Sequence, residues 1–283
     1  MRSYNKSSVT ISRNTAGVDI VSVDGNILSL VDVEKLTFKD GQQVISPAPI
    51  SSLVYDSRVI HSVISASSQN DVIVWYGLGS DVINGQGGTD SLSLAFKQSD
   101  TQISKNPAGV DIIKVGGSIL SLVGVEKLSF IDSEKLLSPK VFSAINYDQR
   151  EINSVWLGSA QDDLLFWYRL GNDVINGGDG TDTLSLAFEE SEAVVFKNPE
   201  GVDIVSVDGQ ILSLVGIEKI SFLTTEKVLT PNSYQSVTYD ASELNSVWLG
   251  TDKDDLLFWY ALGNDVIHGG DGFDSLSLAF KEA

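Results

Sequence analysis

Apolar and polar residues alternate in the first part of the chain. In residues 18–23 (VDIVSV) and 27–30 (ILSL), Val18 and Ile20, and then Leu28 and Leu30, stand two positions apart with a polar residue between them, which is the pattern of a β-strand. Asp-Gly at residues 24–25 separates the two segments, and a two-residue Asp-Gly link favours a tight hairpin. The pattern therefore predicts an antiparallel hairpin.

A second pattern fills residues 158–186. Short apolar pairs are separated there by glycine and aspartate every nine or ten residues, a spacing that does not suit helices. This alternation predicts a solenoid coil in which loops and short strands follow one another. Leu165, Ile175 and Leu184 are the apolar residues that we expect to point into the coil.

The whole chain repeats itself with a period of 92 residues, without insertion or deletion. The segments GVDI, WY and LAF each occur three times at this spacing, and their marker residues are Asp19, Asp111 and Asp203; Trp75, Trp167 and Trp259; and Phe96, Phe188 and Phe280. We therefore expect three tandem copies, at residues 1–96, 97–188 and 189–280. The predicted fold is all-β, with parallel β-roll or β-solenoid coils combined with antiparallel hairpins. The connector at residues 46–61 and its counterparts are left unassigned.

The chain is strongly acidic. It carries 38 Asp and Glu against 19 Lys and Arg, which gives a formal net charge of −19. Such a surface repels phosphate backbones, so nucleic acid is not expected as a partner, whereas divalent cations are favoured. Cysteine is absent, and no apolar run reaches the roughly 18–20 residues that span a bilayer. Because the N-terminus has no apolar signal-peptide centre, we expect export by another route or a trimmed chain.

Residues 177–185 match the nonapeptide pattern G-G-x-G-x-D-x-U-x at every defined position, and residues 269–277 match it equally well. This pattern resembles the calcium-binding repeat of the RTX proteins. Copy one departs from it, with Gln86 in the second glycine position and Ala66 where the other copies have glycine, so we expect it to bind calcium most weakly. Calcium takes six to eight oxygen ligands, and glycine-rich loops with one Asp each can supply carbonyl and carboxylate oxygens.

The resemblance implies that each ion lies between two loops on the same edge of the coil. Asp163 and Asp182 would share one ion, with Asp173 on the opposite edge. The residues expected to hold calcium are Asp71, Asp81, Asp90, Asp163, Asp173, Asp182, Asp255, Asp265 and Asp274, together with Gly177, Asp179, Gly180, Gly269, Asp271 and Gly272. The alternative is that these are ordinary Gly-Asp turns without metal. The threefold occurrence and the acidic excess favour calcium.

Aromatic triplets at residues 74–76, 166–168 and 258–260 offer two interpretations. Exposed aromatics could stack on an extracellular glycan, but residues of this density usually pack, and we favour packing. Trp156 and Trp248 are expected in the core. The two histidines, His61 and His268, are not part of the repeat, and neither a G-x-S-x-G elbow nor an H-E-x-x-H motif is present, so we do not expect an enzyme.

The resemblance extends to segments such as residues 122–130, which look like those flanking the calcium rolls of type I secreted bacterial proteins. It implies a secreted or cell-surface protein that folds outside the cell with calcium. Two functions follow: a structural or adhesive repeat of a surface or biofilm matrix, or a non-catalytic accessory module of a secreted enzyme or toxin that binds glycan or assists export. Copy one lacks the preceding DSLSLAF strand that copy three supplies at its far end, so head-to-tail self-association into filaments is a hypothesis.

Overall fold

The computed structural model describes residues 4–56, 61–75, 77, 79–147, 154–167, 171–239, 247–259 and 264–278. The regular structure in these ranges consists of strands and three short 3-10 helices, so the all-β prediction is confirmed. None of these helices is long and apolar enough to span a bilayer. Copy one contains η1 (Lys6–Ser8), β1 (Thr10–Arg13), β2 (Asp19–Val23), β3 (Asn26–Leu30), β4 (Lys35–Phe38), β5 (Gly41–Val44), β6 (Leu53–Tyr55), β7 (Val63–Ser65), β8 (Val72–Trp75), β9 (Val82–Asn84) and β10 (Ser91–Leu94).

The same elements recur in the other two copies. Copy two contains η2 (Gln98–Asp100), β11 (Thr101–Lys105), β12 (Asp111–Val115), β13 (Ser118–Val123), β14 (Lys127–Ser129), β15 (Glu134–Leu136), β16 (Ala144–Tyr147), β17 (Val155–Leu157), β18 (Asp163–Phe166), β19 (Asp173–Asn176) and β20 (Thr183–Ser185). Copy three contains η3 (Glu190–Glu192), β21 (Val194–Lys197), β22 (Asp203–Val207), β23 (Gln210–Val215), β24 (Lys219–Ser221), β25 (Glu226–Val228), β26 (Ser236–Tyr239), β27 (Val247–Leu249), β28 (Asp255–Trp259), β29 (Val266–His268) and β30 (Ser275–Leu278).

The second half of each copy winds into parallel coils. β6, β8 and β10 lie side by side in one sheet, and β7 and β9 lie side by side in another. Val72 pairs with Leu53 on one side and with Ser91 on the other, so one full coil takes 19 residues. The predicted β-roll is confirmed, and the unassigned connector contributes β6, β16 and β26 to it.

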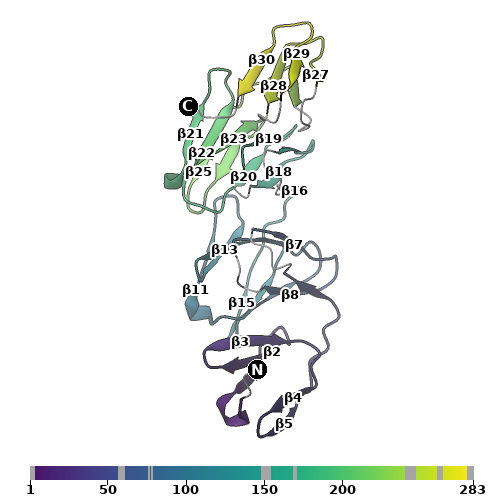
Figure 1. Ribbon diagram of the computed structural model, residues 1–283, viewed down its shortest axis with the longest axis vertical. Helices are drawn as coiled ribbons and strands as arrows, with labels where there is room; N and C mark the ends of the chain where they lie inside the picture. Colours follow the sequence, from purple (N-terminus) through teal and green to yellow (C-terminus); the bar gives the residue numbers. More distant parts are fainter. Residues whose placement is uncertain are drawn as a thin grey trace. The chain divides into compact units, whose positions relative to one another are not determined.

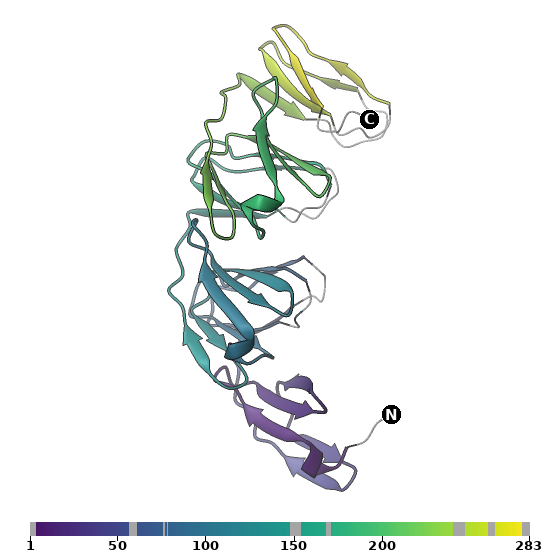
Figure 2. The ribbon, with the colours of Figure 1, turned by 90° about the vertical axis from the view of Figure 1, so that its left-hand side faces the viewer.

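Each roll combines the coil half of one copy with the hairpin half of the next. β13 and β14 of copy two pair in parallel with β9 and β10 of copy one. The resulting sheets have the orders β15-β14-β10-β8-β6 and β11-β12-β13-β9-β7, and copies two and three build a matching pair. The chain accordingly forms two compact units, Met1–Lys105 with Gly109–Val141 and Asn106–Ala108 with Phe142–Ala283 (Figures 1 and 2).

The hairpin turns form as the sequence predicts. Asp24 and Gly25 have φ angles of 49° and 75°, and they connect Val23 to its pairing partner Asn26. Positive φ at both central residues is the geometry that two-residue hairpins require, and Asp-Gly supplies it readily. The corresponding turns use Gly-Gly at residues 116–117 and Asp-Gly at residues 208–209.

The aspartate of the repeated GVDI segment has a structural role. Lys105 Nζ lies 2.6 Å from Asp111 Oδ2, and Lys197 Nζ lies 2.7 Å from Asp203 Oδ2. Both carboxylates are nearly buried at the start of the middle hairpin strand, where a cation offsets the cost of removing their charge from water. These ion pairs tie the first strand of each hairpin segment to the second.

Each unit has its own apolar core between its two sheets. In the second unit the core contains Leu165, Ile175 and Leu184, which are fully buried as predicted and pack with Leu212 and Leu214 of the hairpin segment. The first unit has an equivalent cluster around Ile73, Ile83, Leu92 and Leu120. Burial of such side chains contributes about 1.5–3 kcal/mol each. Because the buried residues come from both the coil and the hairpin segment, both segments are needed to close a core.

The strands at the two extremes of the chain have fewer partners. β3 is an edge strand of the β1-β2-β3 sheet, and β4 pairs only with β5 in the described residues. At the other extreme, β29 pairs only with β27, and β30 pairs only with β28, again counting the described strands alone. In the two complete rolls the equivalents of these strands pair with each other.

Candidate metal centre

An acidic ladder of Asp163, Asp182 and Glu218 crosses three coils at one edge of the second unit. Asp163 begins β18, and Asp182 and Glu218 directly precede β20 and β24. The Asp163 N–H donates to Asp182 Oδ1 at 2.8 Å, and the Asp182 N–H donates to Glu218 Oε2 at 2.7 Å. The carboxylates of Asp182 and Glu218 thus each accept a backbone N–H of the coil before them, and three acidic side chains are held at one edge.

Asp163 has hydrogen-bond donors for both of its oxygens. Its Oδ2 accepts from the Ser159 N–H at 2.7 Å and from the Ser159 hydroxyl at 2.9 Å. Its Oδ1 accepts from the Asn146 side-chain amide at 2.6 Å. Asp163 is therefore stabilised as a carboxylate by the protein itself, although only 3% of its surface is exposed.

Asp182 differs from Asp163 in one oxygen. The residue is fully buried, and its Oδ2 has no hydrogen-bond partner within the described ranges. A buried carboxylate oxygen without a donor costs free energy, because it has lost its water without receiving a replacement. Such an atom points to a cation ligand.

The glycines of the nonapeptide bring backbone oxygens to the same place. A Cβ atom at Gly177 would collide with Asp182 Oδ2 and with the carbonyl oxygen of Gly216 on the next coil. At Gly180, where φ is +123°, a Cβ would lie 2.6 Å from the carbonyl oxygen of Gln161 on the preceding coil. Only glycine therefore permits this stacking, in which carbonyl oxygens of both neighbouring coils approach the nonapeptide loop closely.

Electrostatic repulsion at this edge is considerable. Burial, followed by the charges of Glu218, Asp163 and Asp162, raises the pKa of Asp182 to about 7. Nearby carboxylates disfavour a further negative charge, and a bound dication would reverse that preference. The negative charges of this ladder are therefore not balanced by the neighbouring groups that act on Asp182.

The first unit repeats this arrangement with Asp71, Asp90 and Glu126. The N–H groups of Asp71 and Asp90 donate to the next carboxylate at 2.8 and 2.7 Å. Asp90 is fully buried, its Oδ2 again has no partner in the described part of the chain, and burial together with the charges of Glu126 and Asp71 raises its pKa to about 6. Gln86, which departs from the nonapeptide, adopts a φ of 63° without disturbing these contacts.

Asp71 itself resembles Asp163. Burial alone would raise its pKa, but hydrogen bonds from Ser52 and Ser67 outweigh burial and hold the pKa of Asp71 below its ordinary value. The ladders of both units therefore contain one aspartate satisfied by protein donors and one with an open oxygen.

Asp255 and Asp274 form the ladder of the third copy among the described residues. The Asp255 N–H donates to Asp274 Oδ1 at 3.1 Å, and Thr251 donates to Asp255 Oδ2 through both its N–H and its hydroxyl. A Cβ at Gly269 would again collide with Asp274 Oδ2, so the glycine cradle is retained.

The opposite edge of the rolls uses its aspartates differently. Asp173 Oδ1 accepts from the Ser154 N–H at 2.8 Å, and its Oδ2 accepts from the Trp167 indole N–H at 2.7 Å. Asp81 makes the equivalent bonds to Ser62 and Trp75, and Asp265 accepts from Trp259. The structure therefore separates these three aspartates from the acidic ladders, and it gives both oxygens of Asp81 and Asp173 protein donors.

Most of the tryptophans are packed in the interior of the rolls. Trp75 and Trp167 are 1% and 4% exposed and belong to the cores, so the predicted packing is confirmed for them. Trp156 and Trp248 are buried, also as predicted. The tyrosines at positions 76, 168 and 260 lie outside the described residues.

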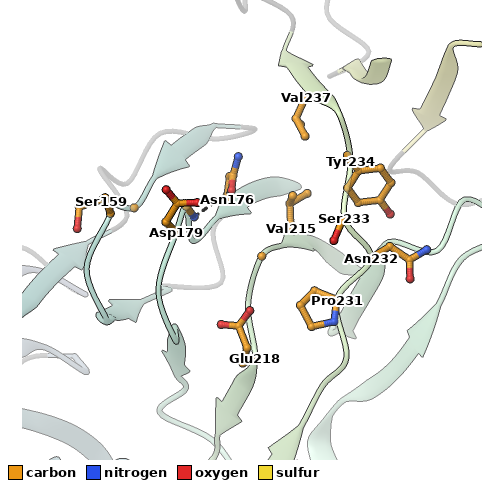
Figure 3. Close-up of a pocket in the computed structure, with 14 residues that line it drawn as sticks. Ser159, Asn176, Asp179, Val215, Glu218, Pro231, Asn232, Ser233, Tyr234 and Val237 are labelled. Atoms are coloured by element: carbon orange, nitrogen blue, oxygen red, sulfur yellow. Dashed lines mark hydrogen bonds between the residues drawn. The ribbon is translucent and has the colours of Figure 1, made fainter. Parts of the chain in front are cut away.

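A cavity of about 730 Å³ opens beside the ladder of the second unit (Figure 3). Glu218 and Asp179 line it, as do Asn176 and the connector residues Asn232 and Tyr234. Asp179 and its counterpart Asp271 are exposed, as are Gly180 and Gly272, which places the tip of each nonapeptide loop at the surface. The edge that carries the open oxygen is therefore next to a polar, acidic space.

The residues present fit calcium. Calcium prefers carboxylate and carbonyl oxygens at about 2.3–2.6 Å, and Asp182 Oδ2 and the Gly216 carbonyl oxygen, both next to Gly177, are oxygens of these two kinds. Within the ranges that the structure describes, no three His, Asp or Glu side chains gather into a ready metal cluster. A cation would therefore rely on backbone oxygens as much as on side chains, as the glycine-rich loops permit.

The sequence reasoning missed Glu126 and Glu218 as members of the ladders. Both recur at the 92-residue spacing, together with Glu34, in front of a Lys-apolar strand, and that recurrence was the available signal. Their partners, Asp90 and Asp182, lie 36 residues upstream in a different copy. Only the pairing of β14 with β10 and of β24 with β20 reveals the contact.

Comparison with known proteins agrees with the nonapeptide assignment. The family model described as RTX calcium-binding nonapeptide repeat (4 copies) matches residues 77–95, 170–187 and 261–277. No curated protein matches the chain. Among solved structures, the chain is similar to the extracellular lipase LipA from Serratia marcescens, with 12% identity and a TM-score of 0.20 over 60% of this chain and 38% of the lipase chain. The matched part is thus well under two thirds of that lipase.

Proposed function

We propose that this chain, which carries RTX calcium-binding nonapeptide repeats, is a non-catalytic structural or adhesive repeat protein that works outside the cell and requires calcium for its stability. Separate molecules of the chain join head to tail in a surface or biofilm matrix. Export by a type I route, as in the proteins that its repeats resemble, would deliver the unfolded chain to calcium.

The open oxygen of Asp182, with its counterpart in Asp90, is the observation that carries the proposal. In each complete roll a buried carboxylate has one oxygen bound by a backbone N–H and the other facing carbonyl oxygens of glycine loops. Calcium supplies the missing positive charge at this point. We propose that three pairs of loops each share one cation. These are the loops of Asp71 and Asp90, of Asp163 and Asp182, and of Asp255 and Asp274.

Calcium at these positions would act as a folding switch. An ion that binds only the folded chain adds its binding free energy to stability, by an amount that grows with the logarithm of its concentration. The carboxylates within each acidic ladder repel one another in the metal-free chain, whose net charge is −19. Low calcium therefore favours the unfolded chain, and high calcium favours stacked rolls.

The opposite edge is a weaker candidate for calcium. Ligation by Asp81 or Asp173 would compete with hydrogen bonds from a buried tryptophan and a serine. We therefore propose calcium first at the acidic ladders, and the assignment of Asp81, Asp173 and Asp265 as ligands stays a prediction.

The accessory-module function remains the second candidate, and one observation favours it. The 730 Å³ cavity is lined by Asn176, Asn232 and Tyr234, and an amide-rich pocket with one aromatic ring suits a sugar. Because Trp167 is buried, glycan binding would use this cavity instead of the aromatic triplets. Loss of binding on a glycan array after Tyr234→Ala, with Trp167→Phe as the control, would support it.

Circular dichroism with a melting curve tests the calcium role. We expect a rise in melting temperature of many degrees in millimolar calcium relative to chelator, or β-structure only in calcium. Magnesium at the same concentration is the control, because it is smaller and gives up its water reluctantly. Identical curves in calcium and chelator would contradict the proposal.

A further inference from the structure

We propose that the two open ends of the chain form one interface between molecules. At this interface, β3 and β4 of a second molecule of the same chain complete the roll begun by β29 and β30; this molecule is called the second copy below and is distinct from the three repeats. The inference rests on the proposed calcium rolls and adds the partner, the register and a residue donated across the interface. The contacts within the chain provide the template.

Two junctions of this kind exist inside the chain. At the first, β13 pairs with β9 through Ser121↔Val82, and β14 pairs with β10 through Lys127↔Ser91. At the second, β23 pairs with β19 and β24 pairs with β20 in the same register, 92 residues further on. Both junctions are parallel strand additions, each made by a hairpin segment docking on a coil.

A third junction would follow the same register. Ser29 of the second copy would pair with Val266, and Lys35 of the second copy would pair with Ser275. Both edges have unpaired backbone groups in the described residues, and parallel strand addition satisfies such groups on both sides at once.

The side chains at the two ends are exposed in the way that this junction requires. Leu276 and Leu278 are 42% and 48% exposed, whereas their equivalents in the two internal junctions are at most 1% exposed. Leu28 is 54% exposed, whereas Leu120 and Leu212 are fully buried in the core clusters of their junctions. One end thus exposes the apolar residues that the other end would cover.

Glu34 of the second copy would supply the missing rung of the third ladder. Glu126 and Glu218 accept the N–H groups of Asp90 and Asp182 at 2.7 Å across the internal junctions. Glu34 stands at the equivalent position and would accept the Asp274 N–H. A second copy would thus complete the cation site formed by Asp255 and Asp274, which links association to calcium.

The 92-residue repeat also shows which residues of the two molecules have equivalent positions at the junction. Because the junction advances the numbering by three periods of 92 residues, residues 1–7 of the second copy and residues 277–283 of the first have the same position in the repeat. Tyr4 accepts the Lys39 N–H, as Phe96 accepts the Ile131 N–H at the first internal junction. The second copy therefore supplies Tyr4 at the position that Phe96 has at the first internal junction.

Sedimentation velocity with two complementary variants tests the interface. Leu28→Lys blocks the β3 end and Leu276→Lys blocks the β30 end, and both positions are exposed enough in the single chain to accept a charge. In millimolar calcium we expect the unaltered chain to form oligomers and each variant alone to stay monomeric. An equal mixture of the two variants should give a 1:1 dimer and nothing larger, since one intact end of each kind remains. A mixture that stays monomeric, or a variant that oligomerises like the unaltered chain, would overturn the interface.

Glu34→Gln tests the shared ladder. Glutamine keeps an acceptor oxygen but removes the charge, and weakening one charge-assisted hydrogen bond in this way corresponds to about a tenfold weaker association. Glu126→Gln, at an internal junction, is the matched control and should lower the melting temperature in calcium without weakening association. Association unchanged by Glu34→Gln would contradict the donated rung.

The same samples distinguish the two proposals. If calcium does not change the melting curve of the unaltered chain, the calcium role fails. If calcium raises the melting temperature but the chain remains monomeric at the highest concentration, only the interface between copies fails.

Discussion

Asp163 and Asp182 show how one residue type can serve two purposes on neighbouring coils. Asp163 receives donors from Ser159 and Asn146 on both oxygens, while Asp182 receives a donor on only one oxygen from the residues that the structure describes. The difference arises because the loop before Asp182 carries glycine where Asp163 has Ser159 four residues upstream, so the donor hydroxyl is missing. The pKa of Asp182, raised by burial and by neighbouring carboxylates, is the electrostatic consequence.

Asp182→Asn is predicted to have opposite effects in chelator and in calcium. Without calcium it removes a buried charge and should stabilise the fold by roughly 1–2 kcal/mol. With calcium it removes a charged ligand and should make the calcium-dependent rise in melting temperature smaller. Urea unfolding in both conditions measures the two effects.

Asp24→Asn is the control for this variant. Asp24 lies in an exposed hairpin turn, and asparagine tolerates its positive φ. It should have the same small effect in both conditions. A loss of stability for Asp182→Asn in chelator would show that the carboxylate has a partner other than calcium.

Stability without metal is predicted to fall as pH rises. The pKa of Asp182 is about 7 in the folded chain, against a model-peptide value of 3.8. Below pH 4 the carboxyl is protonated in both folded and unfolded chains, so no penalty arises. Between pH 4 and 7 the unfolded chain releases its proton first, the folded chain holds more protons, and the free energy of unfolding decreases. Asp90, with a pKa of about 6, adds to the decrease over a narrower range.

Calcium should cancel this trend, because it binds the ionised carboxylates. The gain in melting temperature from calcium is therefore expected to increase from pH 5 to pH 8. Melting curves across that range, with and without calcium, provide the measurement. A metal-free protein that becomes more stable over the same interval would disagree with the electrostatic account.

At the scale of single elements, much of the fold follows from the sequence. Period-two segments flanking Asp-Gly give the hairpins, and Gly-Asp spacing gives the coils, because local turn chemistry and side-chain alternation determine both. The edge on which Asp163 and Asp182 meet was predictable from their separation of one full coil. The hydrogen bonds of Asp173 were not, because no sequence pattern relates an indole N–H to a carboxylate six residues away.

The two tryptophans of copy two provide a matched test of that bond. Trp167 donates its indole N–H to Asp173, whereas the indole nitrogen of Trp156 is buried with no partner in the described ranges. Trp167→Phe removes one hydrogen-bond donor from a buried carboxylate and should cost about 1–3 kcal/mol more than Trp156→Phe. Chemical denaturation in chelator measures both variants, and equal costs would mean that only ring volume matters.

At the scale of the whole molecule, the sequence period and the folded unit are out of phase. The copies at residues 1–96, 97–188 and 189–280 describe the repeat in sequence, but each complete roll takes its coil from one copy and its hairpin segment from the next. Sequence periodicity fixes the length of a repeat and leaves its starting point open, so this phase could not be predicted. The contacts of Glu126 and Glu218 were missed for the same reason, since they cross from one copy to another.

The phase shift also explains why the ends of the chain are complementary. A repeat that folds only with half of its neighbour leaves an unmatched half at each extreme, and repeat proteins bury such surfaces against caps or further repeats. The exposed Leu28 and Leu276 belong to these halves. Stability and association are therefore expected to depend on the same ions.

A crystal structure grown in calcium, with anomalous diffraction data, tests the central claim most directly. The account predicts an anomalous peak about 2.3–2.6 Å from Asp182 Oδ2 and from the Gly216 carbonyl oxygen, with an equivalent peak at Asp90. A peak confined to the exposed Asp179, or no peak beside Asp182 in saturating calcium, would contradict it.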